Sequence, residues 1–269
     1  MEKKLKKSRF GRTLIIIGLI FIIIGGIVIK NSSSKNTSNS SYFWENKSME
    51  EITDLTTKKD SIHPHEVRNI HIALEAANIA FKTGKEFAIE TRNIDKDALT
   101  FGISDTTLVI QNNLSLSKIG FFKNEPKILI TMPENISVDN LYIKLSAGNL
   151  RGSSSTIQAN TATIIVGAGN LEFEKIISQN TEIKCGLGNV AIKGSFLKNT
   201  KAEVGLGNIS LGIQSEETDF SHNASVGLGE ISIGKTKIAG IKENSAEANK
   251  ENHLDLRCGM GSIQVKFNQ

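Results

Sequence analysis

Six copies of a short glycine-rich phrase in the second half of the chain are the first residues that could do chemistry. Gly-x-Gly loops of this kind cradle phosphate groups where a helix follows the glycines. Here a strand of the Ile-x-Ile type follows each copy, so we expect structural turns and no nucleotide site. The last glycine of each copy lies at Gly148, Gly169, Gly188, Gly207, Gly229 and Gly261.

Acidic residues are the next candidates for catalysis, because glycosidases use a pair of carboxyl groups to hydrolyse glycans. With the repeats aligned in chain order, Glu182 faces Lys201 on the next coil, and Lys184 likewise faces Glu203. Opposite charges on neighbouring strands fix the register of the strands. No two carboxylates converge as a general acid and a base would, so the alignment predicts no catalytic residue. The two outward columns are Thr163, Glu182, Lys201, Asn223 and Asp255, and Ile165, Lys184, Glu203, Ser225 and Arg257.

Cysteines and histidines complete the search for reactive or metal-binding side chains. Cys185 and Cys258 occupy the same position in the third and sixth copies. Three steps of ~4.8 Å would separate their sulfurs by roughly 14 Å, which no disulfide spans. His63 and His65 are the one close pair of histidines, and no further ligands for a metal lie near them. We predict free, buried thiols, no metal and no cofactor.

The elements that must position these residues follow from the repeat. Spacings of 21, 19, 19, 22 and 32 residues separate the six glycines, and a period near 20 is typical of a solenoid. A second strand leaves each copy with its apolar residues two apart, as in Val190 and Ile192. The sequence therefore predicts an all-β fold, a single-stranded β-solenoid or β-helix of about 20-residue coils over residues 146–269. Four copies continue with an asparagine, and a ladder of side-chain amides is expected at Asn149, Asn170, Asn189 and Asn208.

Both ends of this solenoid need cover. Residues 67–145 alternate apolar and polar residues and are expected to form an atypical N-terminal β region that caps the coils. Residues 235–254 lengthen the last interval and are expected to project as a loop or short helix. Because the chain ends directly after the last strand, an uncovered final coil would expose unpaired backbone groups. Either the insertion covers that coil, which we favour, or a partner strand adds there.

The N-terminal region predicts a membrane anchor. Residues 13–29 are uncharged and almost wholly apolar, as one transmembrane helix requires. The basic tail of residues 1–12 places the N-terminus in the cytoplasm and the C-terminal domain outside the cell membrane. A cleaved signal peptide is the alternative, but Ile27 to Lys30 offers no small-residue cleavage site. Residues 30–66 are expected to be a flexible linker with one short helix near residues 48–55.

Charge supports this division of the chain. Residues 1–30 hold seven basic residues and one acidic residue, a sum of +6, whereas the whole chain carries +4. The remainder therefore carries 4 minus 6, or −2. The basic character belongs to the membrane end, and the folded part offers no electrostatic basis for binding nucleic acid.

One family combines these features. An expected strand ends at Ile130-Thr131-Met132-Pro133, and repeats follow in which a Gly-x-Gly-Asn turn joins two strands. Together with the N-terminal anchor, this pattern resembles the bacterial putative-adhesin domain family of unknown function. The resemblance covers roughly Val67 to Lys266 and supplies no catalytic residue. It implies a β-solenoid on the cell surface, and members often accompany cell-envelope stress systems.

We therefore expect a non-catalytic module of the cell envelope that binds another protein or an envelope glycan. A second hypothesis is an accessory component of an envelope-stress response that acts through a membrane partner. A glycan-active enzyme is the third, and it would need a carboxylate cluster that the aligned columns lack.

Overall fold

A computed structural model describes residues 56–62, 64–94, 98–112, 126–152, 155–246 and 250–268. The chain divides into two units, Met1–Ile52 and Thr53–Gln269, and every described residue lies in the second unit. Among the described residues no helix is both long and apolar enough to cross a membrane. The transmembrane helix predicted at residues 13–29 and the short helix near residues 48–55 lie outside the described residues.

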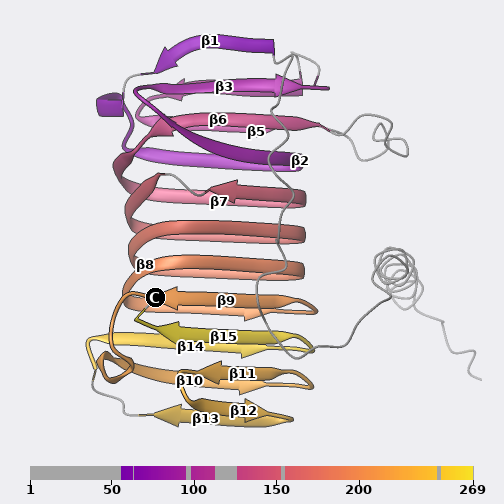
Figure 1. Ribbon diagram of the computed structural model, residues 1–269, viewed down its shortest axis with the longest axis vertical. Helices are drawn as coiled ribbons and strands as arrows, with labels where there is room; N and C mark the ends of the chain where they lie inside the picture. Colours follow the sequence, from indigo (N-terminus) through magenta and orange to yellow (C-terminus); the bar gives the residue numbers. More distant parts are fainter. Residues whose placement is uncertain are drawn as a thin grey trace, which may run out of the picture. The chain divides into compact units, whose positions relative to one another are not determined.

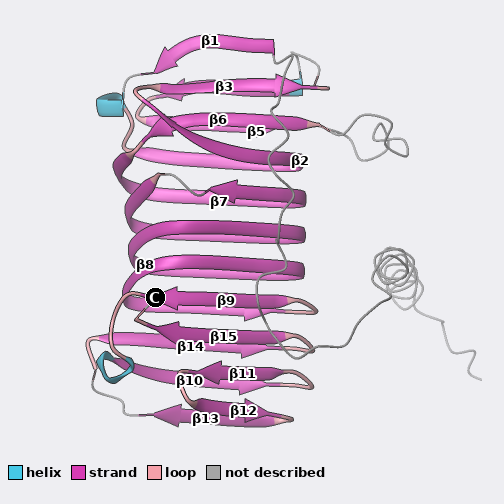
Figure 2. Ribbon diagram, in the orientation of Figure 1, coloured by secondary structure: helices cyan, strands magenta, loops and turns pink. Residues whose placement is uncertain are grey.

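The all-β class is confirmed for the unit that begins at Thr53. Fifteen strands join in one sheet that winds into stacked layers, and the short 3-10 helices η1 (Pro64–Glu66) and η3 (Glu217–Asp219) interrupt them (Figures 1 and 2). The strands are β1 (Thr56–Ile62), β2 (Asn69–Gly84), β3 (Phe87–Arg92), β4 (Leu99–Ser104), β5 (Thr107–Asn112), β6 (Lys127–Pro133), β7 (Asn135–Gly152), β8 (Thr156–Val204), β9 (Asn208–Ile213), β10 (Phe220–Val226), β11 (Glu230–Ile233), β12 (Thr236–Ala239), β13 (Lys242–Ala246), β14 (Asn252–Cys258) and β15 (Ser262–Phe267).

Successive coils pair in parallel with the offsets that the repeat predicts. β7 pairs with β8 from Asn135 opposite Thr156 to Gly152 opposite Phe173, a constant offset of 21 residues. β8 then pairs with β9 from Asn189 opposite Asn208, an offset of 19 residues. Because the corner residues of one coil also bond to the corner of the next, β8 runs unbroken through several turns (Figure 1).

Apolar side chains of alternate residues fill the space between the layers, as period-2 strands require. The buried rings of Phe81 and Phe173 meet with centroids 5.2 Å apart across the coil between them. Gly152 on that coil leaves the room, because a Cβ there would lie 2.6 Å from the ring of Phe173. The core is therefore continuous from coil to coil, which no single coil could achieve.

The sixth repeat copy does not lie at the end of the stack. β14 pairs in parallel with β8 on one side and β10 on the other, and β15 pairs likewise with β9 and β11. The last coil therefore lies between the fourth and fifth copies (Figure 1). Stacking in strict chain order is wrong for this segment. Repeat spacing sets the length of a coil, whereas the side on which a coil adds is set by the connection before it.

Residues 235–254 form this connection, and the expected loop or short helix is wrong. β12 lies antiparallel on β11 and β13 lies antiparallel on β10, so the pair covers the coil of the fifth copy (Figure 2). The insertion does cap the stack, but it caps the fifth coil. The last coil has strands on both sides and needs no partner strand, so the chain end leaves no uncovered coil.

The N-terminal half builds the other cap, as residues 67–145 predict. β5 and β6 pair in parallel with the two halves of β2, whose other edge bonds to β7. Antiparallel strands then close this end, with β4 on β5, β3 on β6 and β1 on β3. β1 lies within residues 30–66, so the linker prediction is wrong for Thr56–Ile62. Its pairing with β3 orders a stretch whose composition gives little sign of a strand.

Both thiols are buried and free. Cys258 lies opposite Val204 and Val226, so it is two coils from Cys185 and not the expected three. Burial raises the pKa of the Cys185 thiol to about 11. Each sulfur therefore takes the place of a valine side chain in the core.

Candidate functional site

The corner glycines form one column because the backbones of successive coils nearly touch there. A Cβ on Gly188 would lie 1.8 Å from the carbonyl oxygen of Gly169, and φ of Gly188 is 135°. In the same way, a Cβ on Gly261 would lie 1.8 Å from the carbonyl oxygen of Gly207, and a Cβ on Gly229 would lie 2.2 Å from that of Gly261. These contacts are between backbones, so the glycines have a structural role. The column runs through Gly148, Gly169, Gly188, Gly207, Gly261 and Gly229.

The asparagines beside these glycines form a ladder in which each Nδ2 donates to the Oδ1 of the preceding coil at 2.8 Å. The ladder extends past both of its expected ends. Asn149 donates to Asn78, and Ser262 donates to Asn208 at 2.6 Å. Sequence reasoning missed Asn78 because Ala77 precedes it where the later copies have glycine. The amides bind one another and hold the coils in register.

A polar groove of about 1000 Å³ lies on the outer face of the strands that lead into these corners. β8, β14, β10 and β13 build it side by side. Most of the lining side chains are outward residues of these strands, whereas Thr181, Thr200 and Ala224 are buried. Ten of the seventeen lining side chains are hydroxyls or amides. They are Thr161, Thr163, Asn180, Thr181, Asn199, Thr200, Asn223, Ser225, Asn244 and Ser245, joined by Glu182, Lys201, Ala224, Glu243, His253, Asp255 and Arg257.

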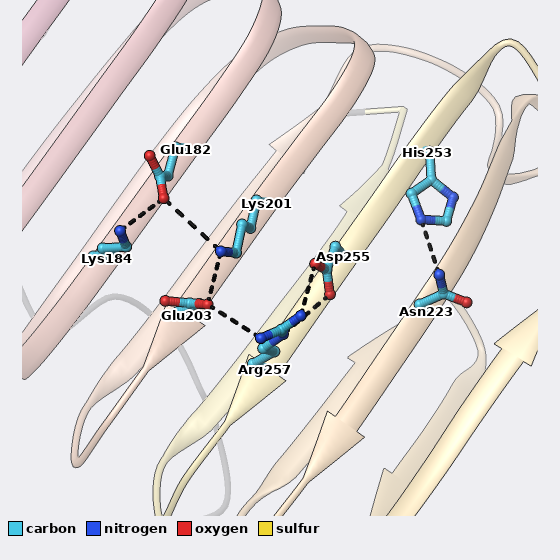
Figure 3. A network of polar contacts seen from close by, with 8 residues as sticks. All are labelled: Glu182, Lys184, Lys201, Glu203, Asn223, His253, Asp255 and Arg257. Carbon is cyan, nitrogen blue, oxygen red and sulfur yellow. Dashed lines mark hydrogen bonds and ion pairs between the residues drawn. The ribbon is translucent and has the colours of Figure 1, made fainter.

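Charged side chains in and beside the groove form one alternating network (Figure 3). Glu182 contacts Lys184 at 2.7 Å and Lys201 at 4.0 Å. Lys201 also contacts Glu203 at 3.0 Å, and Glu203 contacts Arg257 at 3.8 Å. Arg257 closes the network on Asp255 at 3.4 Å. Three acids and three bases therefore balance within the network, and Glu243 is an acidic lining residue outside it.

The aligned columns gave the wrong neighbours for Asp255 and Arg257. These residues lie opposite Lys201 and Glu203, and Asn223 follows Asp255 on the far side. The sign of the charges could have revealed this order. In both columns the charges alternate from coil to coil only when the sixth copy follows the fourth.

The carboxylate of Glu182 is unsuited to donate a proton. A hydrogen bond from Lys184 is the largest cause that holds the pKa of Glu182 below its ordinary value, and the same contact raises the pKa of Lys184. A general acid of a glycosidase needs the opposite shift, because it must stay protonated near neutral pH. Glu182 is therefore unsuited to be the general acid of a glycosidase.

A serine and a histidine at one end of the groove resemble part of a nucleophilic pair. Ser221 Oγ lies 2.8 Å from His253 Nδ1, and it also lies 3.2 Å from the carbonyl oxygen of Asn252. Asn223 Nδ2 lies 3.2 Å from His253 Nε2 (Figure 3). One arrangement satisfies all three contacts: Nδ1–H donates to Ser221, which donates to Asn252, while Nε2 accepts from Asn223. In this tautomer of His253 the hydroxyl proton of Ser221 is committed to a carbonyl, and His253 does not act as a base toward Ser221.

Two aromatic side chains border the groove on the same outer face. The rings of His71 and Tyr142 stack with centroids 4.7 Å apart and planes 17° from parallel. Tyr142 lies opposite Thr163, which lines the groove on the next coil. An aromatic surface beside hydroxyls and amides suits a ligand with both apolar and polar faces.

Comparison with known proteins identifies the family but not the ligand. A family model described as Toastrack DUF4097 matches residues 67–269. None of the curated proteins matches the chain. Three solved structures cover 79–80% of this chain at 13–14% identity.

The first is a putative cell adhesion protein from Clostridium sporogenes, 14% identical and covered over 100% of its length, with a TM-score of 0.40. The second is a putative adhesin from Bacteroides fragilis, 13% identical and covered over 97%, with a TM-score of 0.31. The third is a putative lipid binding protein from Parabacteroides distasonis, 14% identical and covered over 97%, with a TM-score of 0.33. These values are low, so no property of the three proteins is transferred. The family match alone confirms the resemblance seen in the sequence, and the chain belongs to the Toastrack DUF4097 family.

Proposed function

We propose that the chain is a non-catalytic binding module of the cell envelope, a β-solenoid tethered outside the membrane by the helix predicted at residues 13–29. The observation that carries the proposal is the polar groove, with its ten hydroxyl and amide side chains and an ion-pair network whose charges balance. The ligand that suits it best is a neutral envelope glycan.

The chemistry of the lining supports a glycan. Hydroxyl and amide side chains both donate and accept hydrogen bonds, as the hydroxyl and acetamido groups of a sugar chain require of a partner. The coils repeat every ~4.8 Å, so equivalent donors recur along the groove. A ligand with its own regular repeat of polar groups can use several coils at once. The stacked rings of His71 and Tyr142 add an apolar platform at one end.

Removal of two groove hydroxyls tests the proposal. The full chain in detergent would be titrated with oligosaccharides of β-1,4-linked N-acetylglucosamine, with binding followed by calorimetry. Thr163→Val with Ser225→Ala removes two hydroxyls from the groove and leaves the core unchanged. At about 1 kcal/mol for each lost hydrogen bond, affinity should fall about tenfold or more.

The matched control makes the same kind of change on the other outer face. Ser210→Ala with Ser232→Ala removes two hydroxyls from β9 and β11, away from the groove, and should leave affinity unchanged. Equal losses from both pairs would argue against the groove as the ligand site. Absence of binding by the unaltered chain would exclude this class of glycan, and hydrolysis of the oligosaccharide would contradict a non-catalytic role.

A further inference from the structure

Four of the five large apolar side chains exposed among the described residues stand on neighbouring corners of the stack. Leu206, Met260 and Leu228 are the residues between the two glycines of their copies, with 49%, 58% and 74% of their surface exposed. Ile241, which is 88% exposed, lies in the turn between β12 and β13. We call these four residues the corner ridge.

Backbone pairing places the corner ridge in one line. The amide of Met260 donates to the carbonyl of Gly205, and the amide of Leu228 donates to the carbonyl of Gly259, both in the adjacent corner. Ala239 lies opposite Glu230 and Lys242 opposite Val226, so the turn that holds Ile241 flanks the corner of Leu228. The four side chains therefore occupy four successive layers, about 4.8 Å apart.

Folding does not require large apolar residues at this position. Ala147 and Ala168 occupy the same place in the first two copies, and Gly169 makes the same close backbone contact with Gly148 there. The glycines set the turn, and the residue between them points outward. Exposed leucine, methionine and isoleucine on adjacent layers therefore have no role in the core, and clustered exposure of this kind marks an interaction surface.

We propose that the corner ridge inserts into the surface of the lipid bilayer to which the chain is anchored; this rests on the membrane anchor of the proposed function. The ridge is a row of projecting turn tips, so it fits a soft apolar medium better than a pocketed protein surface. Near the ridge Arg257 pairs with Glu203 and Lys237 pairs with Glu230, and Lys242 follows Ile241 in the chain, so the ridge itself is apolar and most of the charge beside it is paired. Residues 30–55 could extend over roughly 90 Å, which lets the ridge reach the bilayer.

A second copy of the chain is a less suitable occupant. Stable interfaces bury about 800 Å² on each partner. Four aliphatic side chains in a single row, already about half covered in the case of Leu206, expose far less than this. Contact with the bilayer does not need so large a buried area, because the membrane anchor holds the chain beside the lipid at a high effective concentration.

Depth-dependent quenching in vesicles tests the corner ridge. The full chain with Leu228→Cys would carry an environment-sensitive fluorophore and be reconstituted in phosphatidylcholine vesicles that contain brominated acyl chains. Cys185 and Cys258 are buried and escape labelling. The label at position 228 should lose most of its emission, and the loss should persist at high salt. The matched control is Leu197→Cys, the exposed leucine that lies off the ridge, whose label should keep its emission.

A second variant shows whether the quenching depends on the apolar residues of the ridge or on the fluorophore itself. With the fluorophore on Leu206→Cys, the changes Leu228→Ser, Met260→Ser and Ile241→Ser should restore most of the emission, since they remove the apolar contact without touching the core. Quenching that is unchanged by these serines, equal at position 197, or dependent on the density of chains would overturn the proposal, the last by indicating a second copy. Chains washed from the vesicles by alkaline carbonate would instead refute the anchor of the proposed function.

Discussion

The regular middle of the stack and its C-terminal end are built from the same repeat but assembled in different orders. From β7 to β9 each coil adds to the one before it in the chain. After β9 the chain skips a layer, builds β10 to β13 at the far side, and returns as β14 and β15 to fill the gap. The difference shows that local repeat chemistry determines the shape of a coil, whereas the order of coils depends on contacts between them.

The N-terminal end follows the same plan in reverse. β2, the first long strand of the chain, lies inside the stack, and β3 to β6 are added on its outer side before β7 continues on the other. At the C-terminal end the last coil is covered by strands that precede it in the chain, whereas β1, the strand nearest the N-terminus, lies at the outer edge beyond β3. Both ends of the stack finish in short antiparallel strands, and short edge strands limit the open backbone that a solenoid end exposes.

An engineered disulfide gives the largest expected effect and tests the order directly. Ser210 lies opposite Gln264 in the structure, whereas chain-order stacking would place Ser232 there. Ser210→Cys with Gln264→Cys should form a disulfide that closes a loop of 264 minus 210, or 54, residues and stabilises the fold by about 4 kcal/mol. Ser210→Cys with Ser232→Cys is the control and should stay reduced. Intact mass and denaturant unfolding with and without reductant measure both, and the reverse pattern would contradict the order.

A methyl group at the corner of the inserted coil is expected to have the next largest effect. The Cβ of Gly261→Ala would lie 1.8 Å from the carbonyl oxygen of Gly207, so the two coils must separate. We expect a loss of about 3 kcal/mol or more in the free energy of unfolding. At Gly102 nothing lies within 4 Å of an added Cβ, so Gly102→Ala should stay within about 0.5 kcal/mol of the parent. Equal losses in the two variants would argue against close corner contacts.

The asparagine ladder distinguishes the middle of the stack from the inserted coil. Asn189 bonds to an asparagine on each side, so Asn189→Ala removes two hydrogen bonds and should cost about 1–2 kcal/mol. Ser262 ends the ladder with one bond to Asn208, and Ser262→Ala should cost about half as much. Urea unfolding compares the two. If Ser262→Ala had no effect while Asn189→Ala did, the inserted coil would not be joined to the ladder.

The sequence predicted the structure of each coil but not the order in which the coils stack. The two-glycine corner, the inward pairs such as Val190 and Ile192, and the amide ladder follow from local patterns that each copy repeats. The place of the last coil depends on contacts between residues far apart in the chain. The interval of 32 residues is compatible with an insertion that caps either the last coil or the coil of the fifth copy. The groove was missed for the same reason, because it needs the inserted coil beside β8. Alternation of charge between Lys201 and Asp255 was the one signal present.

The ion-pair network is expected to show the smallest effect, because its members are exposed. The carboxylate of Glu182 belongs to the regular middle and bonds to Lys184 on its own strand. Glu182→Gln should cost only a few tenths of a kcal/mol near neutral pH, and added salt should reduce the cost further.

The pH dependence of this small term has a definite sign. Contact with Lys184 holds the pKa of Glu182 in the folded protein below its ordinary value of 4.5, so the unfolded chain binds the proton more readily. The stabilisation is therefore complete above pH 4.5 and is lost as the pH falls through the lower pKa of the folded state. Urea unfolding of the parent and of Glu182→Gln should differ at neutral pH and converge in acid. A difference that grew in acid would mean that Glu182 is stabilised in its protonated form, which would make it a candidate acid and reopen the question of catalysis in the groove.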